Sequence, residues 1–128
     1  PRVECSRGDI GQVLINLVTN AAYAIGEWRA QENTETLGRL TVRSQLAVDA
    51  VQVDIEDSGV GVPAAIAGRI YDPFFTTKPV GTGTGQGLSI CRNIIVDRHG
   101  GRLWFTPLMP HGTAFHFTLP LSAVGAAS

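Results

Sequence analysis

The sequence predicts an α+β domain: a two-layer α/β sandwich with a mixed, mostly antiparallel sheet and its helices on one face. Three observations support this fold class. One stretch near the start has apolar residues at helical spacing, and four short stretches alternate apolar and polar residues, as half-buried strands do. The chain has 128 residues, of which 44% are hydrophobic and 16% charged, which fits one globular core. Helices placed between paired strands favour one sheet covered on one side.

The first helix is expected to begin at Asp9, whose side chain can cap it. Its apolar stripe follows the i, i+3/i+4, i+7 rule and consists of Ile10, Leu14, Leu17, Ala21, Ile25 and Trp28. Two strands are expected next, over 40–43 and 51–56, joined by a turn around Asp49. The first half of the chain is therefore a helix followed by a hairpin.

The elements of the second half are predicted from the Gly and Pro residues that interrupt helices and strands. In chain order we expect a short helix over 63–70, a flexible lid over 72–87, a helix over 88–98 ended by Gly100-Gly101, and strands over 103–106 and 113–119. The domain is expected to cover residues 1–121, and the tail 122–128 to be disordered.

Composition excludes some functions. The formal net charge is −1 without a basic run, which argues against a nucleic-acid surface. No apolar run approaches the roughly 18–20 residues that cross a bilayer, so we expect a cytoplasmic domain without direct membrane contact. Cys5 and Cys91 lack metal-site spacing and are expected to be free thiols in a reducing compartment. The opening residues read like the middle of a longer protein.

Asp57 is the first candidate site residue. Strand alternation points it to the same side as the apolar residues Val51, Val53 and Ile55, where a carboxylate needs a partner. Glycines follow it, which lets a ligand approach the backbone. This pattern suits a ligand with N–H donors, such as the adenine amine, although an ordinary strand-end aspartate would look the same.

Asn16 and Asn20 form the second candidate. At i, i+4 spacing they share one helix face. Amide oxygens are neutral, hard ligands, and Mg²⁺ takes few protein ligands beside phosphate and water oxygens. The alternative is a solvated polar face.

The third candidate is the glycine-rich stretch. Phe74-Phe75 and Lys78 precede glycines at alternate positions, whose backbone N–H groups can hold phosphate oxygens; these glycines are Gly81, Gly83, Gly85 and Gly87. The stretch is not a Walker A loop, and a flexible linker is the alternative. Thr113, which starts the last strand, is a weaker candidate.

Together these segments resemble the N, G1, F and G2 boxes of the GHKL, or Bergerat-fold, superfamily, which contains histidine kinases, DNA gyrase, ninety-kilodalton heat-shock chaperones and mismatch-repair ATPases. The matching stretches are 12–21, 57–61, 71–78 and 83–90. The resemblance implies that ATP and Mg²⁺ are the cofactors. One departure is Gln86, where the family usually has Leu.

The resemblance assigns roles near the base and the metal. Asp57 would accept a hydrogen bond from the adenine amine, and Gly59 and Gly61 would let the backbone close on the base. Asn20 would bind Mg²⁺, with Asn16 beside it contacting the ion or the phosphates.

It also assigns the phosphate end. Lys78 would hold the phosphates and act in catalysis together with Asn16. The remaining phosphate-binding residues would be Gly83, Thr84, Gly85, Gly87 and Leu88. Thr113 would support the adenine end.

Asn16 separates branches of the superfamily. Hydrolysing members place a Glu four residues before the Mg²⁺-binding Asn, and an amide there cannot take a proton from water. The chain therefore looks most like the catalytic domain of a sensor histidine kinase, in motif style the nitrogen-regulation type. The alternatives are an ATP-hydrolysing clamp and a nucleotide-binding or serine-kinase regulator.

The phosphoacceptor histidine of such kinases is not found. His99, His111 and His116 all lack the expected helical setting with an acidic residue and a Pro. The expected partners are therefore the protein's own dimerisation and phosphoacceptor domain and, indirectly, a response regulator. The isolated domain is expected to be a monomer and the parent protein a homodimer.

Overall fold

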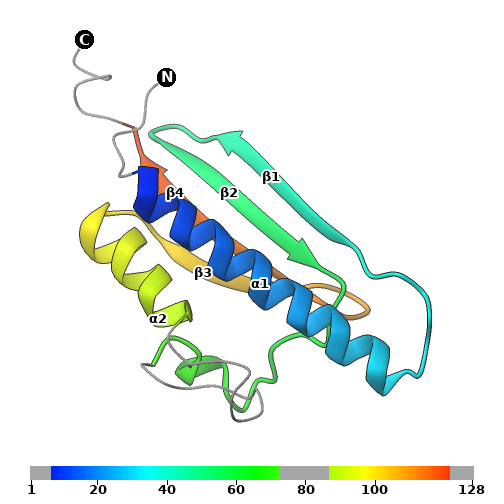
Figure 1. Cartoon of the computed structure of the whole chain (residues 1–128). Helices are drawn as coiled ribbons and strands as arrows, with labels where there is room; N and C mark the ends of the chain where they lie inside the picture. Colours follow the sequence, from blue (N-terminus) through cyan, green and yellow to red (C-terminus); the bar gives the residue numbers. More distant parts are fainter. Residues whose placement is uncertain (1–6, 73–86, 122–128) are drawn as a thin grey trace.

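The computed structural model describes residues 7–72 and 87–121 (Figure 1). In chain order the elements are α1 (Arg7–Gln31), β1 (Leu40–Leu46), β2 (Ala50–Asp57), the 3₁₀ turn η1 (Ala67–Arg69), α2 (Gly87–Arg92), the π-helical segment η2 (Asn93–Arg98), β3 (Leu103–Pro107) and β4 (Thr113–Pro120). Figure 1 shows α1 and α2 on one face of the sheet, which confirms the predicted two-layer α+β sandwich. None of the helices in the described ranges is long and apolar enough to cross a membrane.

The sheet has the strand order β1-β2-β4-β3. All three pairings between the described strands are antiparallel, so no parallel pair is present in this part of the chain, although a mixed sheet was expected. In this register Asp57 at the end of β2 lies opposite Thr113 at the start of β4. The sheet therefore brings two predicted site residues together.

The core lies between the helices and the sheet. Its fully buried side chains are Phe117, Leu17, Ile55, Ile95, Val13 and Cys91. On α1 the buried line is Val13, Leu17 and Ala21, and Ile10 and Leu14 pack against its edge, so the predicted stripe is confirmed from Ile10 to Ala21 except that it missed Val13. Burying each large aliphatic side chain contributes about 1.5–3 kcal/mol, so this buried line determines which face of α1 points toward the sheet.

The ends of α1 differ from the prediction. The helix includes Arg7, so Asp9 lies in its first turn and does not cap it. The Asp9 carboxylate instead accepts a hydrogen bond from Arg98 Nη1 at 3.0 Å, and an acidic residue in the first turn also favours the helix dipole. At the other end Trp28 is only half-buried and takes no part in the core.

The helix expected over residues 63–70 is also wrong in extent. Only one 3₁₀ turn forms, and its hydrogen bonds run from residue i to i−3, as from Arg69 N–H to the Ile66 carbonyl at 2.8 Å. The turn lacks a side-chain cap, and Gly68 lies at its centre. A short segment with a glycine and no cap cannot nucleate a full α-helix.

The helix over 88–98 was predicted as regular, but it widens after Arg92 into η2. At its end His99 Nδ1–H donates to the Ile94 carbonyl at 2.7 Å, five residues earlier. Gly100 then adopts φ +67° and ends the segment, as predicted. The predicted boundary is correct, and helical periodicity does not reveal the wider turn.

Three predictions fall partly or wholly on residues 1–6, 73–86 and 122–128, outside the described ranges. These are the flexible lid, the disordered tail and the free thiol of Cys5. They stay predictions, as do the domain limits, whereas Cys91 is a free, buried thiol.

Candidate functional site

Asp57 is a buried carboxylate at the end of β2. It is 4% exposed, lies on the helix-covered face as predicted, and accepts hydrogen bonds from the backbone N–H groups of Gly59, at 2.8 Å, and Thr113. Burial raises the pKa of Asp57 above its usual value, and the two backbone bonds and the charge of nearby His111 only partly offset that effect. No basic side chain in the described ranges forms an ion pair with it. The carboxylate therefore keeps acceptor capacity for a ligand.

The loop after Asp57 packs tightly against α1. A Cβ atom on Gly59 would lie only 2.5 Å from the Ala24 carbonyl carbon, and Val60 N–H donates to the Ala24 carbonyl oxygen at 3.3 Å. Gly61 has φ +82°, in the left-handed region that favours glycine. The sequence therefore needs glycine at position 59 for space and at position 61 for conformation.

The turn before β4 closes the other side of this loop. Gly112 has φ +117°, and a side chain there would collide with the Asp57 carbonyl oxygen. The position of a Cβ atom on Gly61 lies 3.4 Å from the Gly112 oxygen and 3.8 Å from Thr113 Oγ1. Four predicted residues, Asp57, Gly59, Gly61 and Thr113, are thus gathered in one place.

Asn16, a residue of α1, lies beside the start of α2. Its Nδ2 donates to the Gly87 carbonyl at 3.4 Å, and its Oδ1 accepts from Gln12 Nε2 at 3.1 Å. Leu88 follows Gly87 in the first turn of α2 and packs against the core. The structure therefore brings Asn16, Gly87 and Leu88 together in a second group.

One face of α1 connects the two groups. Asn16, Asn20 and Ala24 are spaced four residues apart, so they follow one another along that face. Asn16 contacts Gly87 and Ala24 contacts the loop at Gly59, which places half-buried Asn20 between the two groups. At a rise of about 1.5 Å per residue the line from Asn16 to Ala24 is about 12 Å long.

Four further predicted residues lie outside the described ranges: Lys78, Gly83, Thr84 and Gly85. Nothing in the structure bears on them.

Two residues beside this site were missed by the sequence analysis. Trp28 of α1 and His111 of the turn before β4 stack with ring centroids 4.2 Å apart and an interplanar angle of 10°. His111 Nδ1 also lies 3.1 Å from the Gly59 carbonyl oxygen. No local pattern could have found the pair, because its members come from opposite ends of the chain.

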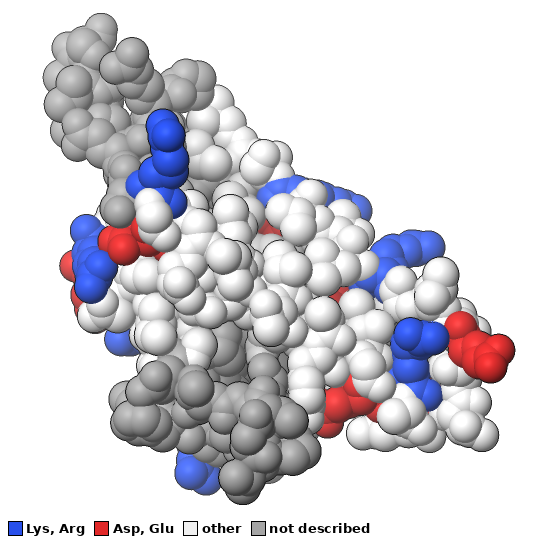
Figure 2. Space-filling model, viewed as in Figure 1, with Lys and Arg blue, Asp and Glu red and all other residues white. Residues whose placement is uncertain are grey.

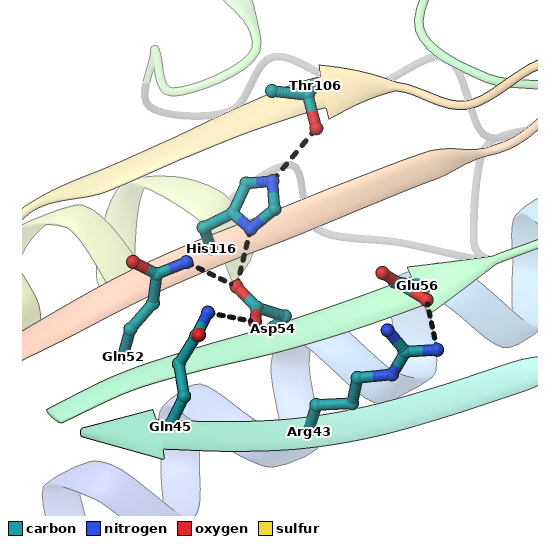
Figure 3. A network of polar contacts seen from close by, with 7 residues as sticks. All are labelled: Arg43, Gln45, Gln52, Asp54, Glu56, Thr106 and His116. Atoms are coloured by element: carbon teal, nitrogen blue, oxygen red, sulfur yellow. Dashed lines mark hydrogen bonds and ion pairs between the residues drawn. The ribbon is translucent and has the colours of Figure 1, made fainter. Parts of the chain in front are cut away.

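A separate polar network lies on the face of the sheet away from the helices (Figure 3). His116 Nδ1 lies 2.6 Å from Asp54 Oδ1, His116 Nε2 lies 2.9 Å from Thr106 Oγ1, and Gln52 and Gln45 donate to the Asp54 carboxylate at 2.8 and 3.2 Å. Burial would raise the pKa of Asp54, but the hydrogen bonds and the charge of His116 outweigh it and leave the pKa lowered. Asp54 and Asp57 point to opposite faces of the sheet. The Asp54–His116 pair is therefore not part of the site around Asp57.

Exposed charged side chains on the helix-covered face lie mainly toward its edges (Figure 2). Figure 2 shows the helix-covered face, where the Lys, Arg, Asp and Glu side chains lie mainly toward the edges and uncharged residues occupy the middle. Any charged ligand at this site would therefore depend on a few local groups.

Comparison with known proteins gives one consistent result. Residues 6–123 match the family model described as histidine kinase-, DNA gyrase B-, and HSP90-like ATPase. The chain is 38% identical over 123 residues to the sensor protein TdiS of Thauera aromatica, covering 94% of this chain and 21% of that protein. It is 35% identical over 123 residues to the sensory histidine kinase/phosphatase NtrB of Escherichia coli O157:H7, covering 94% of this chain and 34% of NtrB.

The solved structures agree with the sequence relatives. The nucleotide-free catalytic domain of the histidine kinase ThkA superposes with a TM-score of 0.77 at 42% identity, over 92% of this chain and 70% of that one. A structure of ThkA in complex with the response regulator protein TrrA superposes with a TM-score of 0.72 at 38% identity, over 94% of this chain and 30% of that one. The chain thus spans only about a fifth to a third of the length of the two sequence relatives.

Proposed function

The chain belongs to the histidine kinase-, DNA gyrase B-, and HSP90-like ATPase family as a sensor histidine kinase catalytic domain, and from this premise we propose that it binds Mg²⁺·ATP and donates the γ-phosphoryl group to a histidine on a separate domain. The acceptor lies elsewhere because the relatives are three to five times longer than the match, and His99, His111 and His116 are all engaged within this domain.

The observation that carries the proposal is the environment of Asp57. A buried carboxylate fixed by two backbone N–H groups, with no ion-pair partner in the described ranges, is a preorganised acceptor. The exocyclic amine of adenine supplies the N–H donor that such an acceptor lacks. Thr113, which donates its backbone N–H to Asp57, supports this end of the nucleotide.

Asn16 and Asn20 fit a Mg²⁺ site. Their side chains offer neutral oxygen ligands on one face of α1, and the Asn20 amide has no recorded hydrogen-bond partner in residues 7–72 and 87–121. When bound, Mg²⁺ neutralises charge on the phosphoryl oxygens. Asn20 would hold the ion, and Asn16, which already bonds Gly87, would orient the start of α2 toward the phosphates.

The phosphate chain would lie along α1 toward α2. Lys78 and the residues Gly83, Thr84, Gly85, Gly87 and Leu88 are proposed to hold it, through a cationic side chain and backbone N–H groups. Asn16 disfavours hydrolysis, because an amide cannot accept a proton from an attacking water. This argument separates the kinase reading from an ATP-hydrolysing clamp.

A response regulator is the proposed downstream partner. The ThkA structure with TrrA shows a related histidine kinase in complex with such a protein. We further propose that the acceptor histidine lies in a helical dimerisation domain of the same parent protein, which makes the parent a homodimer.

The test compares Asp57→Asn with Asp49→Asn, an exposed aspartate in the β1–β2 turn. Asp57→Asn removes a charged acceptor worth about 1.5–3 kcal/mol, so the ATP dissociation constant should rise about tenfold to a hundredfold by calorimetry. Asp49→Asn should bind like the wild type. Equal affinity in all three proteins would refute the role of Asp57.

A phosphorus NMR time course tests the reaction type. Shifted or broadened ATP signals without growing ADP and phosphate support a kinase domain that lacks its acceptor. Steady release of phosphate would favour the ATP-hydrolysing clamp and contradict the argument from Asn16.

A further inference from the structure

His111 is held in one position by two different contacts. Its ring stacks on Trp28 at 4.2 Å with an interplanar angle of 10°, and its Nδ1 lies 3.1 Å from the Gly59 carbonyl oxygen. A carbonyl oxygen can only accept, so Nδ1 carries the hydrogen and donates it. The stack fixes the plane of the ring, and the hydrogen bond restrains the carbonyl group of Gly59.

Gly59 connects His111 to the candidate adenine acceptor. Its carbonyl group, in the peptide unit shared with Val60, accepts from His111, while its N–H, in the peptide unit shared with Ser58, donates to Asp57 Oδ1 at 2.8 Å. Gly59 has no side chain to hold it in place, and on the α1 side its movement is limited by its close approach to Ala24 and by the Val60 N–H, which donates to the Ala24 carbonyl oxygen at 3.3 Å. A rotation of this residue would therefore move the donor that orients the Asp57 carboxylate.

We propose that His111 is a positioning residue for recognition of the purine base: stacked on Trp28, it holds the Gly59 carbonyl group, limits the rotation of Gly59 about its Cα, and thereby keeps the Gly59 N–H in place to orient Asp57 toward the 6-amino group of ATP. The inference rests on the proposed function and goes beyond it, because it assigns base discrimination to a contact between α1, the loop after β2 and the turn before β4. His111 acts through Gly59 and does not touch the nucleotide.

The anchor should affect only the contact that the 6-amino group makes. Purine riboside triphosphate lacks that group and is otherwise identical to ATP, so it should gain little from a well-oriented Asp57. The ratio of the two dissociation constants therefore measures the orientation of Asp57 separately from general damage to the site. A purely structural role of His111 would weaken both nucleotides equally.

Two substitutions separate the two contacts of His111. His111→Phe keeps an aromatic ring to stack on Trp28 and removes the donor. His111→Asn removes the ring but places an amide N–H one bond beyond Cγ, where Nδ1 stands in histidine. Met109→Ala, in the same turn with a side chain that is 89% exposed, is the matched control.

The experiment is calorimetric titration of each variant with Mg²⁺·ATP and with Mg²⁺·purine riboside triphosphate, after urea unfolding has shown each variant to be folded. In His111→Phe the preference for ATP should fall about tenfold, the upper range for one uncharged hydrogen bond, with little change for the analogue. Met109→Ala should keep the wild-type preference, and His111→Asn, which keeps a donor without the stack on Trp28, should lose less of it than His111→Phe. If the Phe variant does not fold, the Asn variant decides, since its preference must fall while its affinity for the analogue stays unchanged.

Four outcomes would overturn the inference. An unchanged preference in His111→Phe, or equal weakening of both nucleotides, shows that His111 is structural while ATP binding itself stands. A preference in His111→Asn as low as in His111→Phe shows that the donor is not what matters. Absence of ATP binding by the wild type refutes the proposed function, and this inference falls with it.

Discussion

Gly59→Ala is the perturbation whose effect follows most directly from the structure. The new Cβ would lie 2.5 Å from the Ala24 carbonyl carbon, 2.6 Å from its Cβ and 2.7 Å from its oxygen. Carbon atoms in contact normally lie about 3.5–4.0 Å apart, so about 1 Å of separation is missing. Two of these three atoms belong to the backbone of α1, which cannot turn aside as a flexible side chain can. The loop after β2 must therefore move away from α1.

That movement should lower both the stability of the protein and its affinity for ATP. Overpacking of this kind costs about 1–3 kcal/mol of unfolding free energy. A displacement of about 1 Å along the bond would also stretch the Gly59 N–H to Asp57 Oδ1 contact from 2.8 Å beyond hydrogen-bond range, which releases the carboxylate. Loss of this charged bond should weaken ATP binding by about tenfold or more.

Urea unfolding and ATP titration measure the two effects separately. The matched control is Gly26→Ala, at an exposed glycine within α1 where nothing lies within 4 Å of the added atom. Ala is the better helix former, so the control should gain about 0.5–1 kcal/mol of stability and bind ATP normally. If Gly59→Ala matched the wild type in urea midpoint and ATP affinity, the packing argument would be wrong.

Two further predictions concern Asp54 and Cys91. Because its folded pKa is lowered, Asp54 contributes stability above its unfolded pKa, near 3.8, and loses it as pH falls through the folded value. Asp54→Asn should cost about 1–3 kcal/mol in urea at pH 7 and flatten the pH dependence of stability below about pH 4, while exposed Asp49→Asn should do neither. Burial raises the pKa of Cys91 to about 11, so in a Cys5→Ser background iodoacetamide at pH 8 should label Cys91 only once urea unfolds the protein; rapid labelling of the native protein would contradict its burial.

The sequence predicted the features that depend on short-range periodicity. Alternation along β2 placed Asp57 on the covered face, and four-residue spacing placed Asn16 and Asn20 on one face of α1. The prediction that the glycines next to Asp57 admit a ligand stays a prediction, and in the structure Gly59 lies against Ala24 of α1. The two placements on β2 and α1 need only the local geometry of one element, which a single sequence specifies.

The features that were missed depend on contacts between distant segments. Alternation predicts that Asp54 faces solvent, yet it is 6% exposed because His116 from β4 and two glutamines cover its carboxylate. The stripe on α1 extends to Trp28 in the sequence, but the partner of that ring is His111 rather than the core. Strand register and the path of the turn before β4 decide both contacts, and neither can be deduced from local spacing.

The same distinction explains how the site is built. A single face of α1 can set the line from Asn16 to Ala24, because helical geometry fixes those positions. It cannot orient Asp57, which lies on a different element and forms no ion pair in the described ranges. The orientation must come from backbone donors, and a backbone donor is only as well fixed as its peptide. Gly59 is held by α1 on one side and, through its carbonyl group, by His111 on the other, so the proposed base recognition would depend on tertiary contacts, whereas the proposed metal and phosphate end would depend on helix geometry.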